Sequence, residues 1–169
     1  MKIKGFKAFY RDMKNNYGMI YEEGKIYTVE NEARFGLKGN GFHFCKYIED
    51  TFRFIDDTEP KIARVTADGD IAEGFDDYNG YYDMYAATII KIDHILTREE
   101  VTAEICKRPV FSAIRTIECG YKFTDDEIEK IRQNFKYNES LEKYIDYHIN
   151  GNIDAFSIQR NKTKTLKRW

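Results

Sequence analysis

A histidine and a cysteine lie two residues apart within Gly41–Cys45, and they are the side chains best suited to chemistry. On a strand, His43 and Cys45 would point to the same face. Such a pair can form an activated thiolate or part of a metal site. A nucleophile also needs an Asn, Asp or Glu to orient the histidine, and a metal needs about three or four ligands, but His94 and His148 belong to no ligand motif. In the structural alternative, His43 hydrogen-bonds to backbone and Cys45 packs as a small hydrophobic residue.

Acidic residues crowd the stretch 68–77, at a density that also occurs in calcium-binding loops. An EF-hand loop requires a glycine at its sixth position, and counting from Asp68 that position is Glu73. We therefore predict no metal site and expect a solvated loop over 73–80. In a second interpretation, the acidic residues form a local surface for the basic groove of a partner.

A tyrosine-rich segment follows the acidic residues and provides the best candidates for contact with a protein partner. Tyrosine and methionine are enriched at interfaces, and the neighbouring carboxylates would steer a basic partner. The candidate partner-binding residues are Asp76, Asp77, Tyr78, Tyr81 and Tyr82. In the alternative interpretation, Tyr82 and Tyr85 are core residues at the start of a strand.

The segment Arg160–Trp169 carries five basic residues and no acid, so it is the one part of the chain that suggests contact with phosphates or an acidic partner. The alternative is a solvated, frayed terminus. The whole chain has a formal net charge of -2, which gives no general attraction to nucleic acid or to a membrane. The motifs of phosphate-binding loops, serine hydrolases, zinc proteases and kinases do not occur, which removes the commonest enzyme classes.

The cysteine content and the absence of long apolar runs predict a cytoplasmic protein. Cys45, Cys106 and Cys119 are an odd number, widely spaced and without a C-x-x-C pair, which favours reduced thiols over disulfides or structural zinc. No apolar run approaches the ~20 residues that span a bilayer. The segment Met1–Lys7 lacks the apolar stretch of a signal peptide.

These candidate residues require a scaffold, and the sequence predicts one α+β domain over 1–169. Residues 1–95 are rich in strand patterns and should form a small mixed or antiparallel sheet, and residues 96–169 should be helical. In the first predicted strand, alternation puts Lys7 and Phe9 on one face and Phe6 and Ala8 on the other. The expected strands are 2–10, 25–30, 41–47, 61–67 and 85–92, with a short helix in 46–55 and a turn at 68–70.

Capping signals define the helical part. Thr97 and Thr124 each precede a glutamate by three residues, which is the pattern of a capping box. Ser140 is expected to cap a further helix that stops near Gly151.

Four segments together resemble a family of phage and prophage proteins that share an N-terminal domain of unknown function. The segments are Gly5–Phe9, Tyr21–Tyr27, Gly41–Cys45 and Val65–Ile71, and their order and spacing match over about residues 3–92. The G-F-H-x-C step at Gly41–Cys45 is the most specific of them. The resemblance implies a mobile-element origin and brings no catalytic residue, and it does not extend to residues 93–169.

The function that we expect is a non-enzymatic protein-binding module, an accessory protein of a phage or mobile element. Its partner would be a host protein or nucleoprotein complex, such as a CRISPR-type defence effector that it inhibits. An alternative rests on a fold-level analogy with ADP-ribosyltransferase-like domains. We expect no cofactor for the binding module; only this alternative would use NAD. His43 or Tyr47 would then line the nicotinamide pocket, but no glutamate-bearing catalytic motif follows. A third possibility is a virion structural or assembly protein.

Overall fold

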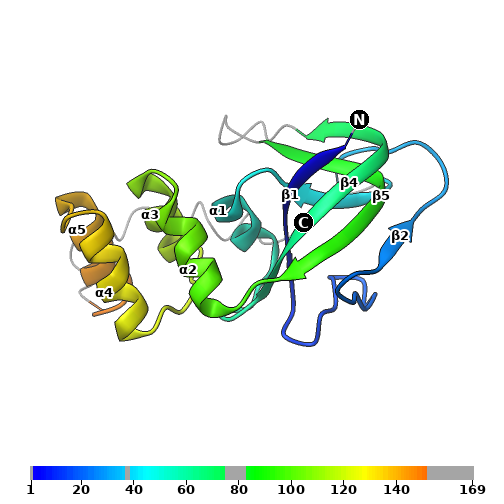
Figure 1. Ribbon diagram of the computed structural model, residues 1–169. Coiled ribbons are helices and arrows are strands. Elements are labelled where there is room, and N and C mark those ends of the chain that lie inside the picture. Colours follow the sequence, from blue (N-terminus) through cyan, green and yellow to red (C-terminus); the bar gives the residue numbers. More distant parts are fainter. Residues whose placement is uncertain (1, 37–38, 75–82, 152–169) are drawn as a thin grey trace.

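The computed structural model describes residues 2–36, 39–74 and 83–151, and it confirms the α+β class. The strands, all paired antiparallel, lie within residues 3–95 together with two short helices, and four longer helices follow them (Figure 1). The strands are β1 (Ile3–Phe9), β2 (Ile26–Thr28), β3 (Phe42–Cys45), β4 (Lys61–Gly74) and β5 (Met84–Ile95). The helices are α1 (Ile48–Thr51), the 3₁₀ helix η1 (Phe52–Phe54), α2 (Arg98–Cys106), α3 (Val110–Glu118), α4 (Asp125–Asn134) and α5 (Glu139–His148).

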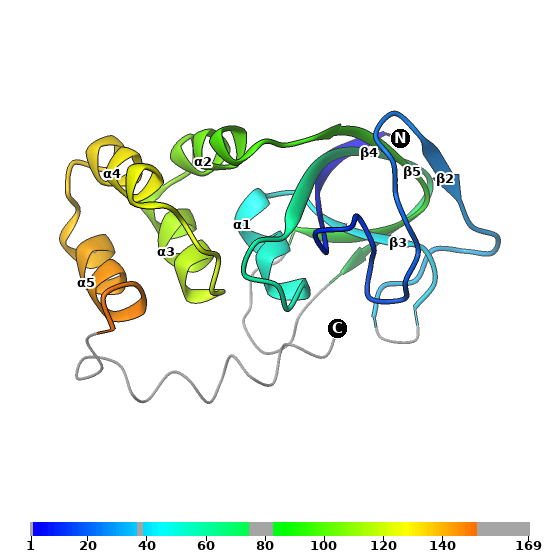
Figure 2. The same ribbon diagram turned by 90° about the horizontal axis from the view of Figure 1, so that it is seen from below.

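The sheet closes on itself. Its strand order is β2-β5-β3-β1-β4, and β4 also pairs with β5 along most of its length. In Figure 2 the strands β1, β3, β4 and β5 accordingly curve around a common centre. The closure is weakest between β1 and β3, where the only paired residues are Phe6 and Cys45. We call this junction the β1–β3 seam.

Alternation along the strands divides the protein into two cores, as the pattern of β1 predicts. The inner core lies within the closed sheet and contains Phe9. The outer core contains Ala8 and Ile62, with Phe6 packed against it, and joins the sheet to the helices. The buried residues of the inner core are Phe9, Tyr21, Phe42, Phe44, Ala63, Val65, Ala67, Tyr85, Ala87, Ile90 and Ile92.

Two of the three predicted helix caps are confirmed. Thr97 and Thr124 both form complete capping boxes, in which the threonine accepts from the N3 amide and the N3 glutamate reaches back. The prediction for the last helix was wrong by two residues: Asn138, not Ser140, is the cap, and its side chain accepts from the amides of Ser140 and Leu141. Either side chain could cap the helix, because Asn and Ser have similar N-cap preferences.

The turn predicted at 68–70 was also wrong, because β4 continues through these residues to Gly74. Asp68 pairs with Ile89 and Ile71 with Ala87, and the register shifts between them as in a β-bulge. Gly69 has a φ of 78°, which glycine adopts without strain. The glycine therefore marks an irregularity within a long strand.

None of the helices in the described part of the chain has the length and apolar character that a membrane crossing requires.

Candidate ligand-binding cavity

A cavity of about 610 Å³ lies beside the β1–β3 seam. It is lined by residues 6–8 of β1, residues 42–45 of β3, the preceding segment 39–41, and residues from 15–21, 29–36 and 51–55, with Met84 at the start of β5. The strands provide one wall, and loops that follow β1 and precede β3 provide most of the rest. The volume lies within the range of about 300–1,000 Å³ that small-molecule sites occupy.

Two asparagines hold the loops that line the cavity. The Asn15 side-chain oxygen accepts from the backbone amides of Tyr17 and Met19, both at 3.0 Å. The Asn40 side-chain nitrogen donates to three successive backbone carbonyls in 30–32, the shortest contact being 2.8 Å, to Glu30. Asparagine suits both positions because its side chain competes well for local backbone groups. These contacts give the cavity wall a defined shape without a helix or a long strand.

Lys7 is a candidate functional residue that the sequence analysis did not single out. It lies on the inner face of β1, and its Nζ donates to the main-chain oxygen of His43 across the seam at 2.6 Å. The same Nζ lies 5.7 Å from the ring centroid of Phe9 and 5.9 Å from that of Tyr21. Burial lowers the pKa of the Lys7 amine from 10.5 to about 8. The alternation in 3–9 did place this lysine on the same face as Phe9, which is the signal that could have singled it out.

His43 lines the cavity, but its ring is held by backbone groups. The Gly36 amide donates to His43 Nε2 at 3.3 Å, and a hydrogen bond with the Gly41 backbone is a further contact of the ring. Burial and the nearby Lys7 charge together lower the pKa of His43 to about 4. The imidazole is therefore neutral at physiological pH, and its geometry corresponds to the structural alternative given above.

Cys45 is buried at the closed end of the seam. Burial raises the pKa of its thiol, so the thiol stays protonated and is a poor nucleophile. Its neighbour Gly5 explains how closely the strands approach here: a Cβ on Gly5 would lie 2.3 Å from the Cys45 carbonyl oxygen. The two side chains of the predicted Cys–His pair thus lie on β3 without forming an activated thiolate.

The remaining predicted site residues lie elsewhere. Tyr47 is not among the described residues that line the cavity, and its ring is covered by Arg108, whose Cζ is 3.7 Å from the ring centroid. The candidate partner-binding residues Asp76, Asp77, Tyr78, Tyr81 and Tyr82 fall within 75–82, outside the described residues. The basic segment 160–169 also falls outside them.

The chemical character of the cavity follows from its lining. Aromatic rings and aliphatic side chains predominate, Lys7 and Arg53 are the cations, and the described lining residues include no aspartate or glutamate. Over the same described part of the chain, no group of three or more His, Cys, Asp or Glu residues is placed to hold a metal ion. The cavity therefore suits a largely apolar molecule with a hydrogen-bond acceptor or a negative charge.

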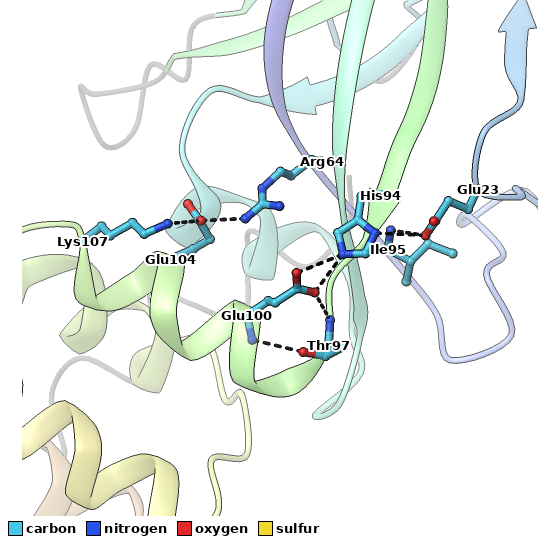
Figure 3. Close-up of polar contacts among 8 residues, drawn as sticks. All are labelled: Glu23, Arg64, His94, Ile95, Thr97, Glu100, Glu104 and Lys107. Carbon is cyan, nitrogen blue, oxygen red and sulfur yellow. Dashed lines mark hydrogen bonds and ion pairs between the residues drawn. The ribbon is translucent and has the colours of Figure 1, made fainter.

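Outside the cavity, a cluster of polar side chains joins the sheet to the helices (Figure 3). His94, near the end of β5, lies between two carboxylates, with Nε2 2.9 Å from Glu100 and Nδ1 3.4 Å from Glu23. Glu100 belongs to the capping box of α2, and Glu23 also accepts from the Ile95 amide. The contacts of His94 with the two carboxylates raise its pKa, and the hydrogen bond to Glu100 has the largest effect.

A family model described as a domain of unknown function (DUF7666) matches residues 3–104, which is more than half of the chain. The protein therefore belongs to this family. The match includes β1 through most of α2, and so includes every element that lines the cavity. No curated protein and no solved structure matches the chain. The mobile-element origin inferred from the sequence stays a prediction.

Proposed function

We propose that this protein is a non-enzymatic binding module whose cavity holds a small, largely apolar molecule with its polar end directed at Lys7. The observation that carries this proposal is the amine of the half-buried Lys7 side chain, which contacts a carbonyl and two rings in a cavity whose described lining contains no carboxylate. A buried amine needs compensation by hydrogen bonds or opposite charge. Within the described part of the chain, the Lys7 amine contacts one carbonyl and two aromatic rings, which leave its capacity to donate hydrogen bonds partly unused.

The NAD-using alternative receives less support from the same residues. His43 does line a concave surface, as that alternative requires, but backbone groups hold its ring. Tyr47 lies against Arg108 instead. The carboxylate that would complete a transferase site has no candidate among the described lining residues. A bound molecule that is held rather than converted agrees better with this chemistry.

Chemical-shift mapping of the ¹⁵N-labelled full chain tests the proposal with three probes: benzoate, benzyl alcohol and indole. We expect probe-dependent shifts at the amides of Lys7, Tyr21 and Phe42. The variant Lys7→Met should weaken benzoate binding while retaining indole, and the matched variant Lys4→Met, exposed on the opposite face of β1, should bind like the wild type. Shifts that appear only away from these amides, or no saturable shift with any probe, would contradict the proposal.

A protein-binding role, as the sequence predicts, is a second candidate with support near the cavity. Tyr17, Ile20 and Ile26 are 84%, 56% and 63% exposed, and Tyr17 also lines the cavity. Large apolar side chains exposed close together along the chain are typical of interaction surfaces. The inhibitor of a defence effector and the virion protein both belong to this class.

Affinity capture from a bacterial host, followed by mass spectrometry, tests this second function. A stoichiometric, unmodified partner that is lost with Tyr17→Ser plus Ile20→Ser supports a surface next to the cavity. Loss with Asp76→Lys plus Asp77→Lys instead assigns the contact to the tyrosine-rich segment. A partner that carries an ADP-ribose mass increase would reverse the choice and favour the transferase.

A further inference from the structure

We infer that Lys7 is a reactive amine, which forms a reversible imine with a small aromatic aldehyde or ketone bound in the cavity. This inference rests on the proposed function, because it requires a ligand in that cavity. It goes further by giving the ligand a chemical class and by making its attachment covalent.

The contacts of Lys7 distinguish it from lysines that form ion pairs in this structure. Lys14, Lys107 and Lys143 each lie within ion-pair distance of a carboxylate. The Lys7 amine instead meets the neutral carbonyl of His43 and the rings of Phe9 and Tyr21. A lysine desolvated among apolar groups is the usual arrangement for an imine-forming residue. Its pKa of about 8 provides a neutral fraction near physiological pH.

The position of the Lys7 amine is also compatible with the imine that the reaction would form. The neutral amine attacks the carbonyl carbon with its lone pair, and the carbonyl oxygen leaves as water together with the two amine protons. A C=N double bond replaces the C=O bond, and nothing is oxidised or reduced. Protonation of the imine gives its nitrogen one N–H. This N–H can be donated to the His43 oxygen, which the Lys7 amine contacts at 2.6 Å before the reaction. Attachment therefore does not require the contact across the β1–β3 seam to break.

The lining favours an aromatic carbonyl compound. Tyr21, Phe35 and Phe42 all line the cavity, and aromatic rings pack well against such side chains. A cavity of about 610 Å³ is ample for a single substituted benzene ring. Because the described lining residues include no carboxylate, a carboxylate substituent on the ligand meets no like charge from them.

Reductive trapping of the full chain tests the inference. The protein is incubated with about one equivalent of 4-carboxybenzaldehyde and sodium cyanoborohydride, and intact-mass and peptide analysis then locates the label. We expect one added group, on Lys7, and labelling of Lys7 about tenfold or more faster than that of exposed Lys4. The rate at Lys7 should rise as the pH passes through about 8. Lys4→Arg should leave the labelling unchanged, and Lys7→Arg should abolish it.

Three further results separate the possible outcomes. The preference for Lys7 should disappear in urea, which shows that the folded cavity causes it even if Lys7→Arg does not fold. Labels spread over surface lysines, with Lys7 unmodified, would overturn the inference. In that case 4-carboxybenzyl alcohol, which cannot form an imine, is decisive: if it still binds at the cavity by chemical-shift mapping, only the covalent step fails. If neither compound reaches the cavity, the proposed function fails as well.

Discussion

The Nζ of Lys7 donates to the main-chain oxygen of His43 at 2.6 Å, at the place where β1 and β3 stop pairing. Beyond Phe6 and Cys45 the two strands form no further residue pair, and the lysine side chain makes the connection that a backbone ladder would otherwise make. The cavity lies beside this connection. One side chain thus both holds the seam and presents an amine to the cavity.

Replacing Lys7 by methionine should stabilise the protein at pH 7. Burial lowers the folded-state pKa of this lysine from 10.5 to about 8, so the charged form costs about 3 kcal/mol of folding free energy below pH 8. The lost hydrogen bond to His43 offsets about 1 kcal/mol of the gain. The cost in the wild type diminishes as the pH rises from about 8 to 10.5, so the advantage of Lys7→Met should diminish over the same range. Urea unfolding of Lys7→Met near pH 8 and near pH 10.5 checks this prediction, with Lys4→Met as the control. If Lys7→Met loses the same stability at every pH, the prediction is contradicted.

His94 should make the protein more stable at mildly acidic pH. Its folded-state pKa is raised by Glu100 and Glu23, so the stabilisation is fully present below the unfolded value of 6.5 and is lost as the pH rises through the folded value. In the variant His94→Gln, the urea midpoint should depend less on pH across this window. His148→Gln, at the end of α5, serves as the control. An NMR titration that places the pKa of His94 below 6.5 would refute the explanation.

An alanine at position 5 should strongly destabilise the closed sheet. The new Cβ would lie 2.3 Å from the Cys45 oxygen and 2.8 Å from Phe44 Cδ2, so the β1–β3 seam must open to accept it. We expect a loss of about 3 kcal/mol or more, as in other overpacked sites. The control is Gly18→Ala, where no atom lies within 4 Å and only the φ of 80° opposes the change, for about 1 kcal/mol. Equal losses for the two variants would show that the seam tolerates separation.

Breaking the ion pair between Arg115 and Asp50 should cost far more stability than breaking an ion pair on the surface. Arg115 Nη1 lies 2.7 Å from Asp50 Oδ1, and the two side chains are 15% and 5% exposed. Asp50→Asn should cost about 3 kcal/mol, because breaking a buried pair leaves charge without its partner carboxylate. Glu139→Gln removes the equally short pair with Lys143, whose side chains are 85% and 60% exposed, and should cost about 0.5 kcal/mol or less. Similar losses in urea unfolding would refute the role of burial.

The features that could be predicted are set by residues that lie close together in the sequence. The two faces of β1 follow from alternation, and the starts of α2 and α4 follow from the capping boxes at Thr97 and Thr124. Helix α3 begins after Pro109 without a side-chain cap, so no such signal marks it. The turn expected around Gly69 was wrong because pairing with β5 overrides the local glycine signal.

The cavity could not be predicted in the same way, because its walls come from distant parts of the chain. Its amine comes from β1 and the acceptor of that amine from β3, with a carbonyl rather than a side chain as the partner. The sequence directed attention to His43, which does line the cavity, but whose ring is held by the backbone of Gly36 and Gly41. Backbone partners leave no pattern of residue types that could be recognised.

The closure of the sheet also sets an order for folding. β4 and β5 follow one another along the chain and pair over most of their length, whereas β1 must find β4 across the segment that contains β2, β3 and α1. Because long-range pairing carries a larger loop-closure cost, the hairpin of β4 and β5 should form early and the docking of β1 should limit the rate. During synthesis, every strand of the closed sheet leaves the ribosome before α2, so the sheet can begin to assemble before helices α2 to α5 are exposed.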